Sequence, residues 1–109
     1  HVHLKEDTKQ MLNKENVHYL KAGCFLINTS RGEVWDENIV CDALKNNKIA
    51  GVATDVLTAE FDDIKRSPIW QLQRHYNIII TPHIGGATID AMRSTEEYIA
   101  DYFINNYSK

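Results

Sequence analysis

The sequence predicts an α/β fold in which short parallel strands alternate with helices. Residues 24–27 and 78–80 are wholly apolar, as expected for strands buried on both faces of a sheet, and residues 51–56 contain β-branched valines. A segment with helical spacing lies between the first two runs, and a longer one follows the third. Strand–helix–strand alternation is typical of parallel βαβ units with right-handed crossovers.

The two clearest helices are predicted from their caps and their spacing. Asp36 is the expected N-cap of a helix whose apolar residues lie between Ile39 and Leu44, and residues 46–48 end it. A long helix is expected to begin at Thr88 or Asp90 and to run to about residue 106. One face of this long helix carries an apolar stripe of Ile89, Met92, Ile99 and Phe103.

The remaining segments have weaker patterns. Val2 and Leu4 indicate the tail of a strand that begins before His1, and Asn13 is expected to cap a short helix that ends at Gly23. Residues 61–76 are predicted to be irregular and broken at Pro68. Three apolar side chains are expected to hold that irregular segment to the core: Ile69, Trp70 and Leu72.

Composition limits the kinds of partner. The 109 residues carry a net charge of −3 without a cluster of Lys or Arg, so we expect no binding to nucleic acid. No apolar stretch approaches the roughly 20 residues that span a bilayer. Cys24 and Cys41 have neither disulfide-framework nor metal-site spacing, so we expect reduced thiols, no metal site and a cytoplasmic protein. The chain begins at His1, which indicates a fragment or a processed product.

Polar residues follow each of the three predicted strands. Thr29, Ser30 and Arg31 follow the first, Asp55 and Glu60 the second, and His83, Gly85 and Gly86 the third. In an open α/β sheet, ligands bind in the crevice outside the carboxyl ends of the strands. We therefore expect an arginine, a carboxylate and a histidine to meet at one edge of the sheet.

Each of these side chains has a catalytic and a structural interpretation. Arg31 suits two-point binding of a carboxylate, or it pairs with Glu33 on the surface. His83 suits proton transfer near neutral pH, or it caps the next helix. Glu60 stabilises the imidazolium of His83, or it is a solvated loop carboxylate. Asp55 binds either a ligand or the backbone of its loop. Thr29 and Ser30 have the same two possible roles.

The combination of arginine, histidine and carboxylate suits redox chemistry at an oxygen-bearing carbon next to a carboxylate. A hydrolase is the alternative, but the sequence has no nucleophile elbow.

The chain resembles the D-isomer-specific 2-hydroxyacid dehydrogenases. The resemblance lies in FLINTSRGEVWDENIVCDALKNNKIAGVATDV, then Glu60, then NIIITPHIGGAT, and so covers almost the whole chain in order. It implies the second half of a Rossmann-type NAD-binding domain at residues 1–87, followed from residue 88 to 109 by a helix that crosses back toward the substrate domain. The family's glycine-rich dinucleotide fingerprint is absent, and His3 and Phe61 stand where prolines are common.

The resemblance also implies roles for the candidate residues. Arg31 would bind the carboxylate of a 2-hydroxy or 2-oxo acid, His83 would be the acid/base, and Glu60 would orient it. Asp55 would bind the nicotinamide of NAD, and backbone near four further residues would help: Thr29, Ser30, Gly85 and Gly86.

At the level of the whole protein, the resemblance implies a homodimer in the full-length form and a fragment that is inactive alone. A regulator or corepressor that binds NAD(H) on the same fold is the alternative.

Overall fold

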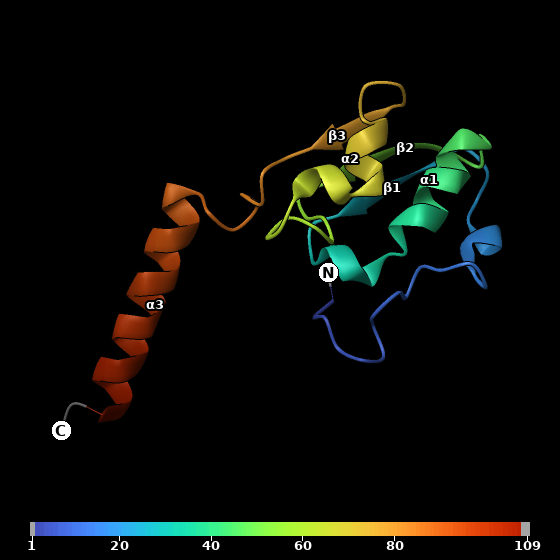
Figure 1. Ribbon diagram of the computed structural model, residues 1–109. Coiled ribbons are helices and arrows are strands. Elements are labelled where there is room, and N and C mark those ends of the chain that lie inside the picture. The colour runs from blue at the N-terminus through green and yellow to red at the C-terminus, as the bar shows by residue number, and fades with distance from the viewer. Residues whose placement is uncertain (1, 108–109) are drawn as a thin grey trace.

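The computed structural model describes residues 2–107. His1 and Lys109, which bound the two predicted segments, lie outside the described residues. Its sheet has three parallel strands in the order β1 (Cys24–Asn28), β2 (Ile49–Thr54) and β3 (Ile78–Ile80) (Figure 1). The predicted α/β fold with a parallel sheet is therefore confirmed. Strand β2 lies two residues earlier than residues 51–56, because the Thr54 hydroxyl donates to the Val56 carbonyl oxygen and the chain turns there.

Helices connect the strands across one face of the sheet (Figure 1). Helix α1 (Glu37–Lys45) joins β1 to β2, and the short 3-10 helix η2 (Gly32–Val34) precedes it. The side chain of Asp36 caps α1 as predicted, since it accepts hydrogen bonds from the N–H groups of Asn38 and Ile39.

The crossover from β2 to β3 is more regular than predicted. It contains a 3-10 helix η3 (Ile64–Arg66) and helix α2 (Pro68–Leu72). The prediction that Pro68 breaks this segment was wrong. Pro68 is the first residue of α2, where a missing N–H costs no hydrogen bond, and Ser67 caps the helix by accepting from the N–H of Trp70.

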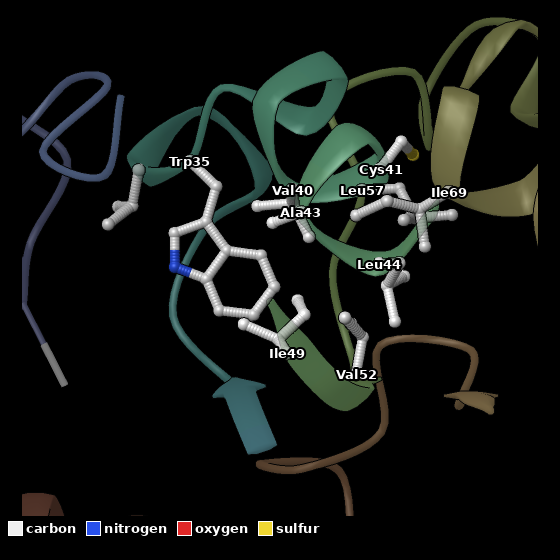
Figure 2. Packing of buried hydrophobic residues seen from close by; sticks show 10 residues of the cluster. Trp35, Val40, Cys41, Ala43, Leu44, Ile49, Val52, Leu57 and Ile69 are labelled. Atoms are coloured by element: carbon white, nitrogen blue, oxygen red, sulfur yellow. The ribbon is translucent and has the colours of Figure 1, made fainter. Parts of the chain in front are cut away.

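The core lies between α1, α2 and the sheet. Figure 2 shows Trp35 and the α1 side chains packed over Ile49 and Val52 of β2, with Ile69 of α2 beside them. Ile69 is buried, and Trp70 and Leu72 pack against the cluster, as predicted. Cys24 and Cys41 are free thiols, and burial raises the pKa of Cys41 to about 11.

The other face of the sheet is open within residues 2–107. Phe25, Ile27 and Ile79 are 65%, 71% and 62% exposed, while their neighbours Leu26 and Ile78 turn toward the core. The prediction that these strands are buried on both faces was therefore wrong for the described residues, because both crossovers run over the same side.

The N-terminal segment also differs from its prediction. Val2 and Leu4 are not part of a strand, because they make no ladder to the sheet. Asn13 precedes a single 3-10 turn, η1 (Val17–Tyr19), and Gly23 lies four residues beyond its end. Gly23 does adopt the left-handed conformation expected of it, with a φ of +74°, at the turn into β1.

Helix α3 (Ile89–Tyr107) projects from the rest of the molecule (Figure 1). It begins and ends within a residue or two of its predicted limits. None of its described residues is buried, and its predicted apolar stripe is solvent-exposed: Ile89, Met92, Ile99 and Phe103. Among the helices of residues 2–107, none combines the length and apolar character that crossing a bilayer requires.

Candidate active site

The polar loops after the three strands meet around one cavity. Its volume is about 780 Å³, and it lies at the carboxyl ends of β1 and β2 and beside the loop after β3. The residues that line it are Ile27, Thr29, Arg31, Asp55, His83, Gly85 and Gly86. Arg31, Asp55 and His83 share this cavity, whereas Glu60, the carboxylate expected to orient His83, lines a smaller cavity together with Asp55 and His83.

His83 and Glu60 form a hydrogen-bonded pair. The distance from His83 Nδ1 to Glu60 Oε1 is 2.9 Å. The second oxygen, Glu60 Oε2, accepts from the N–H of Leu57 at 3.1 Å, which fixes the carboxylate within its own loop. With Nδ1–H donating to Glu60, the His83 Nε2 atom is left to face a ligand. This is the base–orienter geometry of a proton-transfer site.

The backbone at His83 is unusual. Its φ is +54°, in the left-handed region that residues with a side chain rarely adopt. Such a conformation costs on the order of 1–3 kcal/mol and persists only where surrounding contacts impose it. The N–H of His83 donates to the Thr81 carbonyl oxygen at 3.0 Å, and Asp55 binds the loop on both sides of His83.

Asp55 accepts three hydrogen bonds from the loop that carries His83. Its Oδ1 accepts from the Thr81 hydroxyl and from the N–H of Ile84 at 3.0 Å, and its Oδ2 accepts from the N–H of Gly85 at 2.7 Å. Burial by itself raises the pKa of Asp55, but these hydrogen bonds and the nearby His83 outweigh it and hold the pKa below its ordinary value. The backbone-binding role left open for Asp55 is therefore present.

Arg31 stands at the cavity with its guanidinium exposed to solvent. The salt bridges among residues 2–107 do not pair it with Glu33, and its Nη1 donates instead to the Ser30 carbonyl oxygen at 2.6 Å. Buried Asn28 organises this loop, because its Oδ1 accepts from Ser30 and its Nδ2 donates to the Arg31 carbonyl oxygen at 2.9 Å.

A second cavity of about 310 Å³ is lined by Glu60 and His83 themselves, together with Asp55. Its walls are mostly apolar and include Leu57, Ile64 and Trp70. Phe61, which stands where proline is common in the resembled family, is 90% exposed, with its ring centroid 6.1 Å from that of His83.

Several residues that shape the site were not among the predicted site residues. Asn28, Thr81 and Glu37 each hold a site loop through side-chain hydrogen bonds. Asn28 and Thr81 had one usable signal, which is a hydrogen-bonding side chain at the end of a strand. Glu37 had none, because its partners are 21 and 30 residues away in sequence. Within the described residues, no group of three or more His, Cys, Asp or Glu could hold a metal ion.

Comparison with known proteins identifies the family. Residues 1–85 match the family described as D-isomer specific 2-hydroxyacid dehydrogenase, NAD binding domain. The chain is 41% identical over 106 residues to a D-specific alpha-keto acid dehydrogenase of Enterococcus faecium, covering 89% of this chain and 33% of that protein. It is 38% identical over 104 residues to a D-3-phosphoglycerate dehydrogenase of Haemophilus influenzae, covering 95% of this chain and 25% of that protein.

The fold is similar to solved structures of the same kind. A D-lactate dehydrogenase from Sporolactobacillus sp. superposes with a TM-score of 0.77 at 33% identity, over 100% of this chain and 36% of that one. The chain therefore spans between a quarter and about a third of the length of the relatives named here. By sequence and by fold, the chain belongs to the D-isomer specific 2-hydroxyacid dehydrogenases, within their NAD-binding domain.

Proposed function

We propose that this chain supplies the cofactor-binding and proton-transfer half of an NAD-dependent dehydrogenase of D-2-hydroxy acids. In the direction of reduction, a 2-oxo acid, NADH and a proton give a D-2-hydroxy acid and NAD⁺. The observation that carries the proposal is the His83–Glu60 pair at the rim of a cavity that also holds Arg31 and Asp55.

The side chains divide the chemistry among them. Arg31 binds the substrate carboxylate through its guanidinium, for which its exposure at the cavity is suited. His83 donates a proton from Nε2 to the carbonyl oxygen as the alcohol forms, and takes it back in the reverse direction. Glu60 holds the ring through Nδ1 and balances its positive charge. When bound, NADH supplies the hydride that the carbonyl carbon accepts.

The cavity is suited to the nicotinamide end of NAD. Gly86 has open space where a Cβ would stand, so a flat ring can approach the backbone there. Asp55 Oδ2 accepts one hydrogen bond, from Gly85, and a carboxylate oxygen has a further lone pair for the carboxamide N–H. Thr29, which follows β1, also lines this cavity, and Ser30 is the next residue of the same loop. We assign five residues to cofactor binding, with Arg31 and His83 adjoining the nicotinamide: Thr29, Ser30, Asp55, Gly85 and Gly86.

The same proposal extends to the organisation of the protein. Residues 1–87 would be the second half of the NAD-binding domain, and the helix from residue 88 would lead toward a substrate domain supplied elsewhere in the protein. Two observations support this division: the open sheet face around Ile27, and the exposed apolar stripe of α3. On this basis the chain alone should be inactive, and the complete enzyme should be a homodimer. The free thiols of Cys24 and Cys41 fit a cytoplasmic location.

The test is NADH oxidation by the natural protein that contains this chain, with a panel of 2-oxo acids at neutral pH. His83→Ala should lower kcat/KM by about 10²–10⁴-fold, because it removes the acid/base. Arg31→Ala should raise KM and lower kcat, whereas Arg74→Ala, a surface arginine outside the cavity, should change neither. NADH binding without turnover of any 2-oxo acid would contradict the enzyme and favour an NAD(H)-binding regulator.

A further inference from the structure

Glu37 is a buried carboxylate outside the proposed catalytic set. It is the first residue of α1, and 4% of its surface is exposed. Removing a carboxylate from water costs free energy unless its oxygens find donors. The position of Glu37 at the start of a helix does not explain its burial, because a solvated glutamate would interact with the helix dipole equally well.

Both oxygens of Glu37 are hydrogen-bonded, and to two different segments. Oε1 accepts from the backbone N–H of Thr58 at 2.8 Å, and Oε2 accepts from the hydroxyl of Ser67 at 2.6 Å. Ser67 is fully buried and is the N-cap of α2. One side chain on α1 thus ties down both the loop after β2 and the start of the next helix.

The loop that Glu37 holds is the one that presents Glu60. Thr58 lies two residues before Glu60, within a turn that Leu57 and Glu60 close. The N–H of Leu57 donates to Glu60 Oε2, and the carbonyl oxygen of Leu57 accepts from the Glu60 N–H. A shift of the Leu57–Thr58 peptide would therefore move the Glu60 carboxylate directly. The hydrogen bond that Glu37 accepts from the Thr58 N–H restrains that peptide.

Gly32 restrains the same peptide by a different contact. A Cβ at Gly32 would lie 2.3 Å from both the Leu57 carbonyl carbon and the Thr58 nitrogen, so the two backbones are in close contact. Arg31 immediately precedes Gly32. The Arg31 loop and the Glu60 loop are thus in direct contact, and the Glu37 hydrogen bond lies beside that contact.

We propose that Glu37 is a positioning residue, which fixes the Leu57–Glu60 turn so that Glu60 holds the His83 imidazole with Nδ1–H toward the carboxylate. The proposal rests on the proposed function, because it concerns the same Glu60–His83 pair. Glu37 touches neither the cavity nor His83, and it acts only through Thr58 and Glu60.

The first test is the tautomer of neutral His83, read by NMR on the full chain labelled with ¹⁵N-histidine, with the His83 signal assigned from His83→Asn. Glu37→Leu has similar bulk and no acceptor, so it should shift His83 from Nδ1–H toward Nε2–H. Glu37→Gln keeps an oxygen for the Thr58 N–H and should restore the wild-type tautomer. Ser67→Ala removes the other hydrogen bond and the α2 cap, but leaves Thr58 bound, so it should leave His83 unchanged.

The outcomes separate positioning from general stability. A wild-type His83 tautomer in a folded Glu37→Leu chain overturns the proposal, as does an equal change in Ser67→Ala. If Glu37→Leu does not fold, Glu37→Asp, which withdraws the carboxylate from Thr58 by one methylene, must show the same shift, and an unchanged signal there also overturns it.

The second test separates this proposal from the proposed function. In the natural protein, Glu37→Leu should lower kcat about tenfold or more with little change in KM, since a small displacement of a catalytic pair costs that much. The tautomer measurement needs no turnover. A shifted tautomer in a protein without dehydrogenase activity would therefore support the positioning role while the proposed function failed.

Discussion

Asp55 and Glu37 are both carboxylates withdrawn from water, and every oxygen of each accepts a hydrogen bond. Asp55 holds the loop of His83, and Glu37 holds the loop of Glu60. The two members of the proposed proton-transfer pair are thus fixed by separate buried anions. Single substitutions can test each of these anchors, and the close contact at Gly32, independently.

Asp55→Asn should destabilise the fold at neutral pH by about 1–3 kcal/mol, because an amide cannot accept all three donors. Since the pKa of Asp55 is lowered in the fold, its contribution is present above about pH 3.8, its ordinary value, and is lost as pH falls through the folded-state pKa. The difference in unfolding free energy between wild type and variant should therefore become smaller on acidification. Urea unfolding at pH 7 and at pH 3 measures this.

The control for Asp55 is Asp101→Asn, an exposed carboxylate on α3. It should leave the pH dependence of the unfolding free energy as in wild type. A gap between wild type and Asp55→Asn that widened below pH 3.8 would contradict the lowered pKa.

Gly32→Ala should lower the unfolding free energy by about 1–3 kcal/mol, because its Cβ would overlap the Leu57–Thr58 backbone and force the two loops apart. Gly86→Ala is the matched control for stability, since nothing lies within 4 Å of its Cβ position. Chemical denaturation of the two variants measures the difference. Equal stabilities would show that the loops can separate freely.

Helices α1 and α2 start at capped positions that also anchor the site. Asp36 caps α1 one residue before Glu37, and Ser67 caps α2 while donating to Glu37. The cap of α1 was predictable, because an aspartate before an apolar periodic stretch is a local signal. The cap of α2 was not recognised, since Pro68 was interpreted as a break rather than as the first residue of a helix.

Asp36→Ala should cost about 0.5–2 kcal/mol of stability, because two N–H groups at the start of α1 lose their acceptor. Asp36→Ser keeps a capping oxygen and should recover most of that loss. Thermal or urea unfolding followed by far-UV circular dichroism provides the measurement. A serine variant as unstable as the alanine variant would mean that the charge, and not the cap, matters.

As a whole, the molecule consists of a sheet covered on one face and a helix that projects from it (Figure 1). Phe25, Ile27 and Ile79 form an apolar surface on the open face, and α3 carries a second one. Exposed apolar surfaces of this kind mark interfaces or cause association. The helical spacing of α3 predicted the second surface, whereas the strands that carry the first were predicted to be buried on both faces.

The combined variant Phe25→Ser, Ile27→Ser, Ile79→Ser should reduce self-association of the 109-residue chain with little loss of stability, because these side chains are already exposed. Tyr19→Ser, at an equally exposed aromatic residue of η1, is the control and should leave association unchanged. Light scattering against concentration measures the effect. A large loss of stability in the triple variant would mean that the face is covered in solution.

Local patterns were sufficient for the three strands, for α1 and α3, and for the residue types proposed for the site, but not for η1, η3 or α2. Apolar runs gave the strands, capping and periodicity gave α1 and α3, and polar residues after each strand pointed to Arg31, Glu60 and His83, because parallel strands end at one edge. The hydrogen bonds that orient these groups depended on tertiary packing. Glu37, Thr58 and Ser67 are far apart in sequence and meet only when α1 packs beside the second crossover. The left-handed backbone of His83 likewise lies in a loop that is held by Asp55, a residue far earlier in the sequence that accepts from the N–H of Ile84.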